Sequence, residues 1–441
     1  MLKKKMTRYL FVITLVFLSP FLKAQETYDI SSLINRVLEE NYQIRIVKNR
    51  ALISDNNNTP GNAGLLPTLD AQLTRSRSNN NIRNEYFTGV VREDDNARSD
   101  NFNTYAILNW TVFDGFRMFA RRDQLGMLSD LGQLETRYYI EQTVADIANA
   151  WYQLIRENRL LANYFETLGV SRYRLVLEKK KLDVGSGNAL LFNQALVDYN
   201  TDSLAMMNQE RIIKSLVIRI NEIANLDPDM NIKPADEIIN GLILQKDTLL
   251  KKAIDANIEI KQTLIEEMIA EKDIAIMRSN YYPEVNIYGQ YSFNRQTNEI
   301  GTIQYGKNFG RQVGVTVRFN LFNGFNDKRM VENSKVTMEN TSLQKENIRK
   351  QISSTVIDNY YQYISIAQQV VVAEQNIITA QKSLDIGKAQ FQEGAISGFD
   401  FRQTQLSLIR AQNAASTLKY NLKSIEIELL RLSGDIVEKL I

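Results

Sequence analysis

The sequence contains the same structural unit twice, and this duplication restricts the possible folds more than any other feature. One set of residues recurs 216 positions later: Leu33, Val37, Asn41 and Pro67 return as Leu249, Ala253, Asn257 and Pro283. A second set recurs 209 positions later: Phe113-Asp114-Gly115-Phe116 returns as Phe322-Asn323-Gly324-Phe325, and Gly185 returns as Gly394. Self-similarity over such a distance indicates a tandem repeat. The fold must therefore contain the same order of helices and strands twice.

We divide the chain at the repeat boundaries: 25–226 is the first repeat, 227–246 an inter-repeat linker or equatorial segment, 247–433 the second repeat and 434–441 a C-terminal tail. Residues 1–24 have the pattern of a signal peptide, because a basic stretch and an apolar core at residues 10–18 precede Ala24. That core is about nine residues long, whereas a helix needs about 20 to cross a bilayer. A secreted, periplasmic or outer-membrane destination follows.

Composition excludes most catalytic chemistry. Cysteine and histidine are both absent, which removes disulfides, thiolate and imidazole metal sites, and nucleophiles that depend on either group. Removal of residues 1–24 takes away five basic residues and no acidic one, so the formal charge changes from +2 to −3. Nucleic acid is therefore not expected as a partner. Catalysis by carboxylates alone survives this exclusion, and acidic pairs such as Glu39-Glu40 are the candidates for it. Because adjacent residues on a helix point in different directions, we interpret these pairs as solvated surface and expect neither an enzyme nor a cofactor.

Each repeat is predicted to contain two strands, at about 66–76 and 103–113 and at about 284–294 and 312–322. Apolar and polar residues alternate there, as in Val285-Asn286-Ile287, which predicts one apolar and one polar face. Strands of about ten residues suit either a hairpin on a soluble core or a tilted crossing of a bilayer. The segment between Arg75 and Thr104, rich in Asn, Arg and Asp, is predicted to be a polar loop.

After the second strand of each repeat, apolar residues recur at every seventh position: Val356, Tyr363, Val370, Ile377, Leu384 and Phe391, and in the first repeat Ile147, Leu154, Leu161, Leu168, Leu175 and Leu182. This period predicts long helices that pack through a supercoiled seam. Each repeat should form a helical hairpin, with its tip near 185–188 or 394–397. In the returning helix of the first repeat, Asp202 and Gln209 interrupt the apolar pattern.

Helix lengths predict how the shorter helices are arranged. A helix over 116–184 would be about 105 Å long, and the shorter helices add in pairs to a similar length. We therefore expect 188–225 to stack end to end with 247–280, and 397–433 with 30–63. The fold class is mostly α, with long coiled-coil hairpins and four strands per chain.

Four strands cannot close a barrel, and in lipid every open strand edge leaves backbone groups unsatisfied. Closure must come from copies of the chain. Two, three or four copies would give 8, 12 or 16 strands, and strand geometry alone does not choose among them. Aromatic residues at the strand-to-helix joints fit either a membrane interface or packing within the joint: Trp110, Phe113, Phe116, Phe319, Phe322 and Phe325.

Several features follow one another in this chain: a signal peptide, a doubled helix-strand-strand-helix-helix unit, Pro67 and Pro283 before the strands, turns at Asp114-Gly115 and Asn323-Gly324, and the tip glycines. In these features the chain resembles the TolC-like outer-membrane efflux proteins. The resemblance covers essentially the whole mature chain. It implies a homotrimer with one 12-stranded β-barrel in the outer-membrane lipid and a periplasmic α-helical tunnel. It also implies the exit duct of a tripartite efflux pump or type I secretion system, joined to a periplasmic adaptor and, through it, to an inner-membrane transporter.

The resemblance also implies a periplasmic gate just past the tips, where relatives carry acidic residues. The matching positions are Asp400 and Gln403 in the second repeat and Leu191 and Gln194 in the first. Three copies of Asp400 would form a cation-attracting ring; alternatively, Asp400 is a first-turn carboxylate favoured by the helix dipole. Phe391 and Ile396 occupy positions where relatives often hold a polar network, so an apolar closure is expected rather than a charged latch.

The tips resemble those that dock an adaptor, and the tip residues are Gly185, Ser186, Gly187, Asn188, Gly394, Ala395 and Ser397. A local role in ending one helix and capping the next also explains them. The alternative function is a pore-free periplasmic adaptor or coiled-coil scaffold. Salt should release such a scaffold from membranes, whereas a barrel should require detergent.

Overall fold

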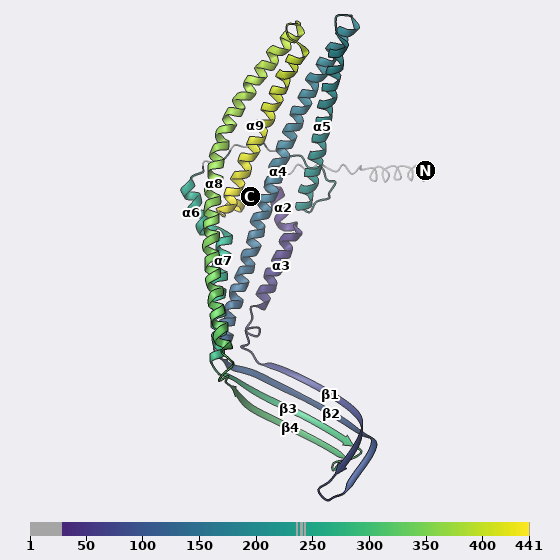
Figure 1. Cartoon of the computed structure of the whole chain (residues 1–441), viewed down its shortest axis with the longest axis vertical. Coiled ribbons are helices and arrows are strands. Elements are labelled where there is room, and N and C mark those ends of the chain that lie inside the picture. Colours follow the sequence, from purple (N-terminus) through teal and green to yellow (C-terminus); the bar gives the residue numbers. More distant parts are fainter. Residues whose placement is uncertain (1–28, 235–236, 239–240, 242–243, 441) are drawn as a thin grey trace, which may run out of the picture. The chain divides into compact units, whose positions relative to one another are not determined.

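The computed structural model describes residues 29–234, 237, 238, 241 and 244–440, which fall into two compact units (Figure 1). The helical unit contains the described residues of 29–45, 139–257 and 352–440, and the sheet unit contains 46–138 and 258–351. The predicted signal peptide, 1–24, lies outside the described residues. None of the described helices is both long enough and apolar enough to cross a membrane.

Two helical hairpins account for most of the chain. α4 (Arg117–Asp183) and α8 (Asn326–Gln392) each contain 67 residues, which is about 100 Å of helix at 1.5 Å per residue. Each is followed by a returning helix of 35 residues, α5 (Ala189–Ile223) or α9 (Gly398–Leu432). Both predicted hairpins are therefore present, and both long helices contribute residues to both units.

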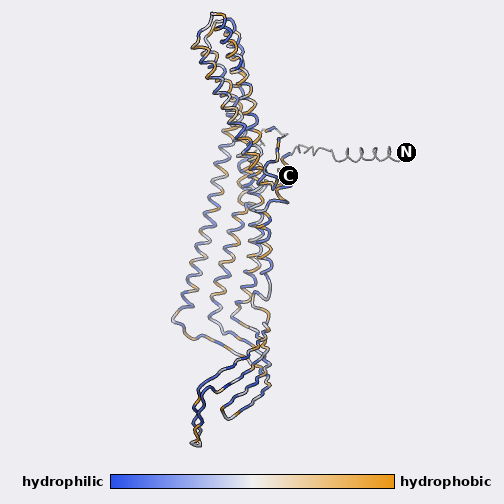
Figure 2. Tube along the Cα trace, turned by 90° about the vertical axis from the view of Figure 1, so that its right-hand side faces the viewer, coloured by the Kyte–Doolittle hydropathy of each residue, from blue (hydrophilic) through white to orange (hydrophobic). Residues whose placement is uncertain are grey.

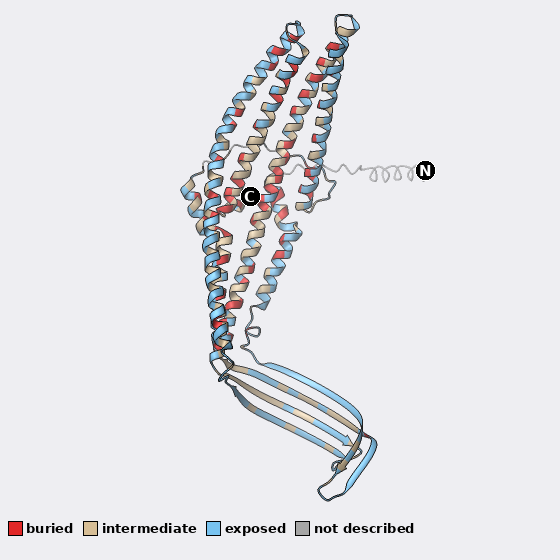
Figure 3. Cartoon of the chain, in the orientation of Figure 1, coloured by how far each residue is buried: buried red, intermediate tan, exposed pale blue. Residues whose placement is uncertain are grey.

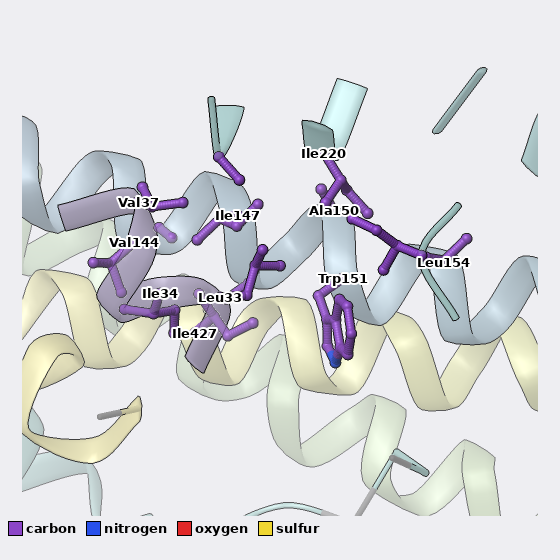
Figure 4. Packing of buried hydrophobic residues seen from close by; sticks show 14 of the residues in the cluster. Leu33, Ile34, Val37, Val144, Ile147, Ala150, Trp151, Leu154, Ile220 and Ile427 are labelled. Atoms are coloured by element: carbon purple, nitrogen blue, oxygen red, sulfur yellow. The ribbon is translucent and has the colours of Figure 1, made fainter. Parts of the chain in front are cut away.

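The core of the helical unit forms where α2 (Ile30–Glu40) packs against α4. Figure 4 shows its centre: Leu33, Ile34 and Val37 from α2, Val144, Ile147, Trp151 and Leu154 from α4, Ile220 from α5 and Ile427 from α9. α10 (Ile436–Leu440) adds the buried Ile436. Burial of each large apolar side chain stabilises the fold by roughly 1.5–3 kcal/mol. Because the cluster contains residues of α2, α4 and α5 as well as of α9, it joins the two repeats.

The first helix of each repeat is broken at an equivalent asparagine. α2 gives way to α3 (Tyr42–Asn57) at Asn41, and α6 (Lys246–Ala256) gives way to α7 (Ile258–Arg278) at Asn257. The Asn41 side chain donates to the carbonyl of Ile223 (2.8 Å), and the Asn257 side chain donates to the carbonyl of Leu432 (3.1 Å). These carbonyls belong to the last residues of α5 and α9.

The expected stacking of 188–225 with 247–280 and of 397–433 with 30–63 is therefore wrong. Each returning helix ends at the break in its own repeat, since the asparagine amide pairs with a C-terminal carbonyl that the helix itself leaves unpaired. Helix lengths could not distinguish the two pairings, because the repeats have nearly equal lengths.

The seven-residue seam is buried over different lengths in the two repeats. In α8 its members are buried except for Ile377, which is half-buried. In α4 only Ile147 and Leu154 are buried, whereas Leu161, Leu168, Leu175 and Leu182 are half-buried. Beyond Leu154, the buried positions of α4 include a polar row: Glu157, Asn163, Thr167, Ser171, Arg174 and Glu178. Figure 3 shows the buried positions along these helices.

The sheet unit contains one antiparallel sheet in the order β1 (Thr68–Glu85), β2 (Val91–Asp114), β3 (Glu284–Asn298) and β4 (Tyr305–Arg318). The segment predicted as a polar loop instead extends β1 and β2 well beyond 66–76 and 103–113. Backbone pairing continues there whatever the side chains, and it is reinforced by cross-strand ion pairs such as Arg83 with Glu93. The extended strands of this hairpin are strongly hydrophilic, up to the apolar residues of the turn (Figure 2). β4 lies somewhat earlier than the predicted 312–322.

The register gives the sheet two different faces, because residues directly paired across strands lie on the same face. The apolar face includes Leu69, Leu73, Leu108, Ile287, Val313 and Val315. The polar face includes Asp70, Gln72, Tyr105, Gln290, Ser292 and Gln312. Within the sheet unit, none of the described helices packs on either face. Val313 is 81% exposed and Leu69 73% exposed.

The strand-to-helix joint has the same geometry in both repeats. Gly115 and Phe116 have φ of 71° and 68°, and Gly324 and Phe325 have φ of 69° and 63°. The rings of Phe113 and Phe116 meet edge to face at 5.2 Å, as do those of Phe322 and Phe325 at 5.4 Å. The rings therefore pack within the joint and still leave Phe116 59% and Phe325 71% exposed.

Candidate functional site

Both helical tips use the same turn to end the long helix. Gly185 and Gly394 have φ of 75° and 74°, a conformation that glycine adopts without strain. After each glycine, the next amide reaches back to the helix: Ser186 N–H donates to the Lys181 carbonyl (3.0 Å) and Ala395 N–H to the Gln390 carbonyl (2.8 Å). This pattern is a Schellman motif, which satisfies the last carbonyls of a helix.

The residues that follow cap the returning helices. The Asn188 side chain accepts from Leu190 N–H at 2.7 Å. Ser397 forms a reciprocal capping box with Asp400: Asp400 N–H donates to Ser397 Oγ (3.1 Å), and Ser397 N–H donates to Asp400 Oδ2 (3.3 Å). The local explanation of the tip residues is therefore sufficient for their geometry. It leaves Asp400, Ser186 and Ala395 exposed to solvent.

The structure brings together three of the four gate positions at which relatives carry acidic residues. Leu191 and Gln194 from α5 and Gln403 from α9 line one hollow of about 240 Å³, together with Arg174, Asp198 and Phe399. Asp400 does not line this hollow. The hollow lies between the hairpins of the two repeats, close to their tips.

Phe391 and Ile396 belong to an apolar cluster beneath the second tip. The rings of Phe391 and Phe401 stack at 5.0 Å with an interplanar angle of 10°, and both side chains are buried. Ile396 packs against this cluster, as do Val170 and Leu177 of α4. Apolar packing therefore connects the second tip to the first repeat.

A buried charged network, which the sequence did not lead us to predict, lies beside this apolar cluster. Arg402 of α9 donates to both carboxylate oxygens of Asp202 of α5, at 2.6 and 2.7 Å. Ser171 of α4 donates to the same carboxylate. Arg174 pairs with Asp198 and donates to the Gly398 carbonyl at 3.2 Å. The hairpins are thus joined by ionic contacts as well as apolar ones.

A second polar contact explains the other interruption in the apolar pattern of α5. The Gln209 side chain donates to the Glu157 carboxylate at 2.6 Å and to the Glu157 carbonyl at 3.1 Å. Asp202 and Gln209 therefore face buried polar partners. Their position in an otherwise apolar seam was the signal that could have revealed the network.

No group of three or more carboxylates in the described residues is arranged to hold a metal ion. Of the acidic side chains near the tips, Glu178 and Asp198 pair with cations and Asp400 takes part in a helix cap. The arrangement is suited to joining helices through buried polar groups.

Residues 249–435 match the family of outer membrane efflux proteins. No curated protein sequence matches the chain. Solved structures with a similar fold include the CmeC outer membrane channel of Campylobacter jejuni, with 13% identity, a TM-score of 0.78, and coverage of 92% of this chain and 86% of that one.

Two further structures support the same fold. VceC, an outer membrane protein of Vibrio cholerae, has 16% identity and a TM-score of 0.74, with 92% of this chain and 96% of that chain covered. The open state of the MtrE outer membrane channel of Neisseria gonorrhoeae has 14% identity and a TM-score of 0.65, with coverage of 92% and 89%.

The resemblance drawn from the sequence is confirmed, because the second repeat matches the efflux family and the fold extends over both repeats. The predicted fold class is confirmed as well. The expectation that the chain is not an enzyme agrees with a family of efflux proteins.

Proposed function

We propose that three copies of this chain form a passive exit duct in the outer membrane. Each copy contributes four strands to a 12-stranded barrel and two helical hairpins to a periplasmic tunnel. The main support is the uncovered sheet, whose apolar face has no protein to pack against and whose edges, β1 and β4, are unpaired within one chain. Lipid can cover the apolar face, and neighbouring copies can pair the edges.

The polar face then lines the passage. Most of its side chains are hydroxyls and amides, and it also carries the charged Asp70, Glu284 and Arg318; such polar groups keep a channel hydrated. Exposed aromatic rings at the joints, such as Phe116 and Phe325, suit the interface between lipid and periplasm. The half-buried Leu161, Leu168 and Leu175 of α4 offer apolar surface for packing among the helices of adjacent copies.

The helical tips are proposed to dock a periplasmic adaptor, which connects the duct to an inner-membrane transporter of an efflux pump or a type I secretion system. Gly185–Asn188 and Gly394–Ser397 are exposed or half-buried in one chain. Cargo would move through without a chemical step, because energy and selection come from the transporter. The gate would include Asp400, Gln403, Leu191 and Gln194, closed partly by packing around Phe391.

Fractionation and conductance together test this function. The full chain should remain in the membrane fraction after high-salt washing and require detergent for extraction. The purified protein should then open ion-conducting channels in planar bilayers. A pore-free adaptor or scaffold would instead leave the membrane in salt and give no conductance, and that result would reject the duct.

A further inference from the structure

The apolar face of the sheet ends in a row of cations on the side away from the helical joints. One row of backbone-paired residues crosses all four strands: Arg75 of β1 pairs with Phe102 of β2, which pairs with Arg295 of β3, which pairs with Lys307 of β4. The next row of the same face carries Arg77 and Asp100, and the row after it carries Arg98. We call Arg75, Arg77, Arg98, Arg295 and Lys307 the cationic rim.

The spacing places this rim at the far edge of the apolar band. Ten positions of β3 separate Val285, beside the joints, from Arg295. At about 3.3 Å per residue and a tilt of about 40°, these positions span about 25 Å across the membrane. That height equals the apolar band of an outer-membrane barrel, which is about 25 Å. The cationic rim therefore falls where lipid chains end and headgroups begin.

Aromatic rings rather than carboxylates hold two of the cations. Arg295 lies over the ring of Phe102 (5.6 Å to the centroid), and Lys307 lies over the rings of Phe309 (4.9 Å) and Phe293 (5.8 Å). Among the described residues, neither Arg295 nor Lys307 forms an ion pair. Their charges are positioned at the surface but not neutralised.

Nearby acids offset only part of the rim charge. Asp100 accepts from Arg75 at 2.9 Å and from Arg77 at 2.7 Å, and Glu299 accepts from the backbone N–H of Arg98 at 2.8 Å. Five cations against two carboxylates leave a net charge of +3 in each chain. The tip of the β1–β2 hairpin, beyond the register shift near Asn80, has the opposite balance, with Arg83 and Arg92 against Glu85, Glu93, Asp94 and Asp95.

We propose that the cationic rim binds phosphorylated headgroups of lipids in the outer leaflet. The apolar face would contact the acyl chains of the same lipid, while the rim cations would pair with its phosphates. Arg311, four residues from Lys307 on the same face, has a side chain long enough to extend toward the rim. This inference rests on the proposed function, because it requires the apolar face to meet lipid.

Lipid A provides the test. The purified full chain in detergent is incubated with bisphosphorylated lipid A or with lipid A whose phosphates have been removed, and retained lipid is counted by native mass spectrometry. Each rim cation beside an anionic headgroup favours binding of the charged lipid. We expect the wild type to prefer the phosphorylated form by roughly tenfold or more, and Arg295→Gln/Lys307→Gln to lose most of that preference.

Arg83→Gln/Arg92→Gln is the matched control, because it removes the same charge from the neighbouring hairpin outside the rim. It should retain the wild-type preference. Equal binding of both lipids by the wild type would overturn the proposal, as would an unchanged preference in the rim variant. Conductance in phosphatidylcholine bilayers is measured in parallel: its absence in the wild type rejects the duct, whereas normal conductance without phosphate preference rejects only the lipid site.

Discussion

The carboxylate of Asp400 belongs to a helix cap, and the same carboxylate is the candidate for an acidic ring. The two roles are separable by substitution. Asp400→Asn retains an oxygen that can accept from Ser397 N–H but removes the charge, so it should reduce cation preference with little change in stability. Reversal potentials in planar bilayers under a salt gradient measure that preference. An unchanged reversal potential for Asp400→Asn would reject the ring.

Ser397→Ala is the complementary control, because it removes the cap and keeps the charge. Loss of an N-cap costs about 1 kcal/mol. We expect Ser397→Ala to lower the thermal stability and leave the reversal potential unchanged, whereas Asp400→Ala should affect both.

Tyr363 makes stability depend on pH at the alkaline end. Burial, with a smaller contribution from the charge of Glu426, raises the pKa of Tyr363 to about 12 from an ordinary value of 10.0. The neutral phenol therefore stabilises the folded state fully below about pH 10, and this contribution is lost as the pH rises toward 12, on the order of 2–3 kcal/mol in total. Gly241 of the linker lies so close to the Tyr363 hydroxyl that a Cβ there would overlap it.

Ultraviolet absorbance of the phenolate, compared between the wild type and Tyr363→Phe, measures this titration. The difference spectrum should develop only well above pH 10 in the folded protein and near pH 10 after denaturation. A difference spectrum that develops near pH 10 in the folded protein would contradict the buried position of Tyr363.

At the scale of helices, the contact between Arg402 of α9 and Asp202 of α5 joins the two repeats. Both side chains are 10% exposed. Arg402→Met leaves a buried carboxylate without its cation and should destabilise the helical unit by about 3–5 kcal/mol. Asp202→Leu/Arg402→Met removes both charges and should recover most of that loss. Thermal unfolding followed by circular dichroism measures both variants.

The ion pair of Lys419 with Glu374 offers a comparison, since it also joins two helices but its side chains are 34% and 45% exposed. Lys419→Met should cost at most about 1 kcal/mol. If Arg402→Met cost no more than Lys419→Met, the network would be a surface feature and not a tie between repeats.

The periodicity of apolar residues predicted the helices and strands, but it could not predict which side chains contact one another in the folded chain. Alternation as in Val285-Asn286-Ile287 located the strands, but it fades beyond Arg75, where both faces are polar and backbone pairing alone continues the hairpin. Asp202 was visible in the sequence only as an interruption, because its partner, Arg402, lies 200 residues away. The tip glycines revealed the tips in the sequence. The hollow that Leu191 and Gln403 line could not be predicted, because it depends on how the two hairpins pack against each other.

For the whole assembly, the two unpaired sheet edges predict which strands meet between copies. β1 and β4 lie at opposite edges of one sheet, so a bond between them must join different chains. The absence of cysteine allows such a bond to be introduced without background. We expect Gln72→Cys in β1, combined in separate variants with Asn308→Cys, Gln312→Cys or Thr316→Cys in β4, to give disulfide-linked oligomers for the pair that lies opposite across the joint.

Denaturing electrophoresis without reductant then counts the copies. A closed ring of three chains gives linked species no larger than a trimer, equivalent to 12 strands, whereas rings of two or four chains stop at a dimer or tetramer with 8 or 16 strands. Gln72→Cys alone should remain monomeric on the gel, because its thiols lie on one edge of each chain. A ladder without an upper limit would show open strand addition, and it would contradict a barrel, since only a closed ring leaves no edge exposed to lipid.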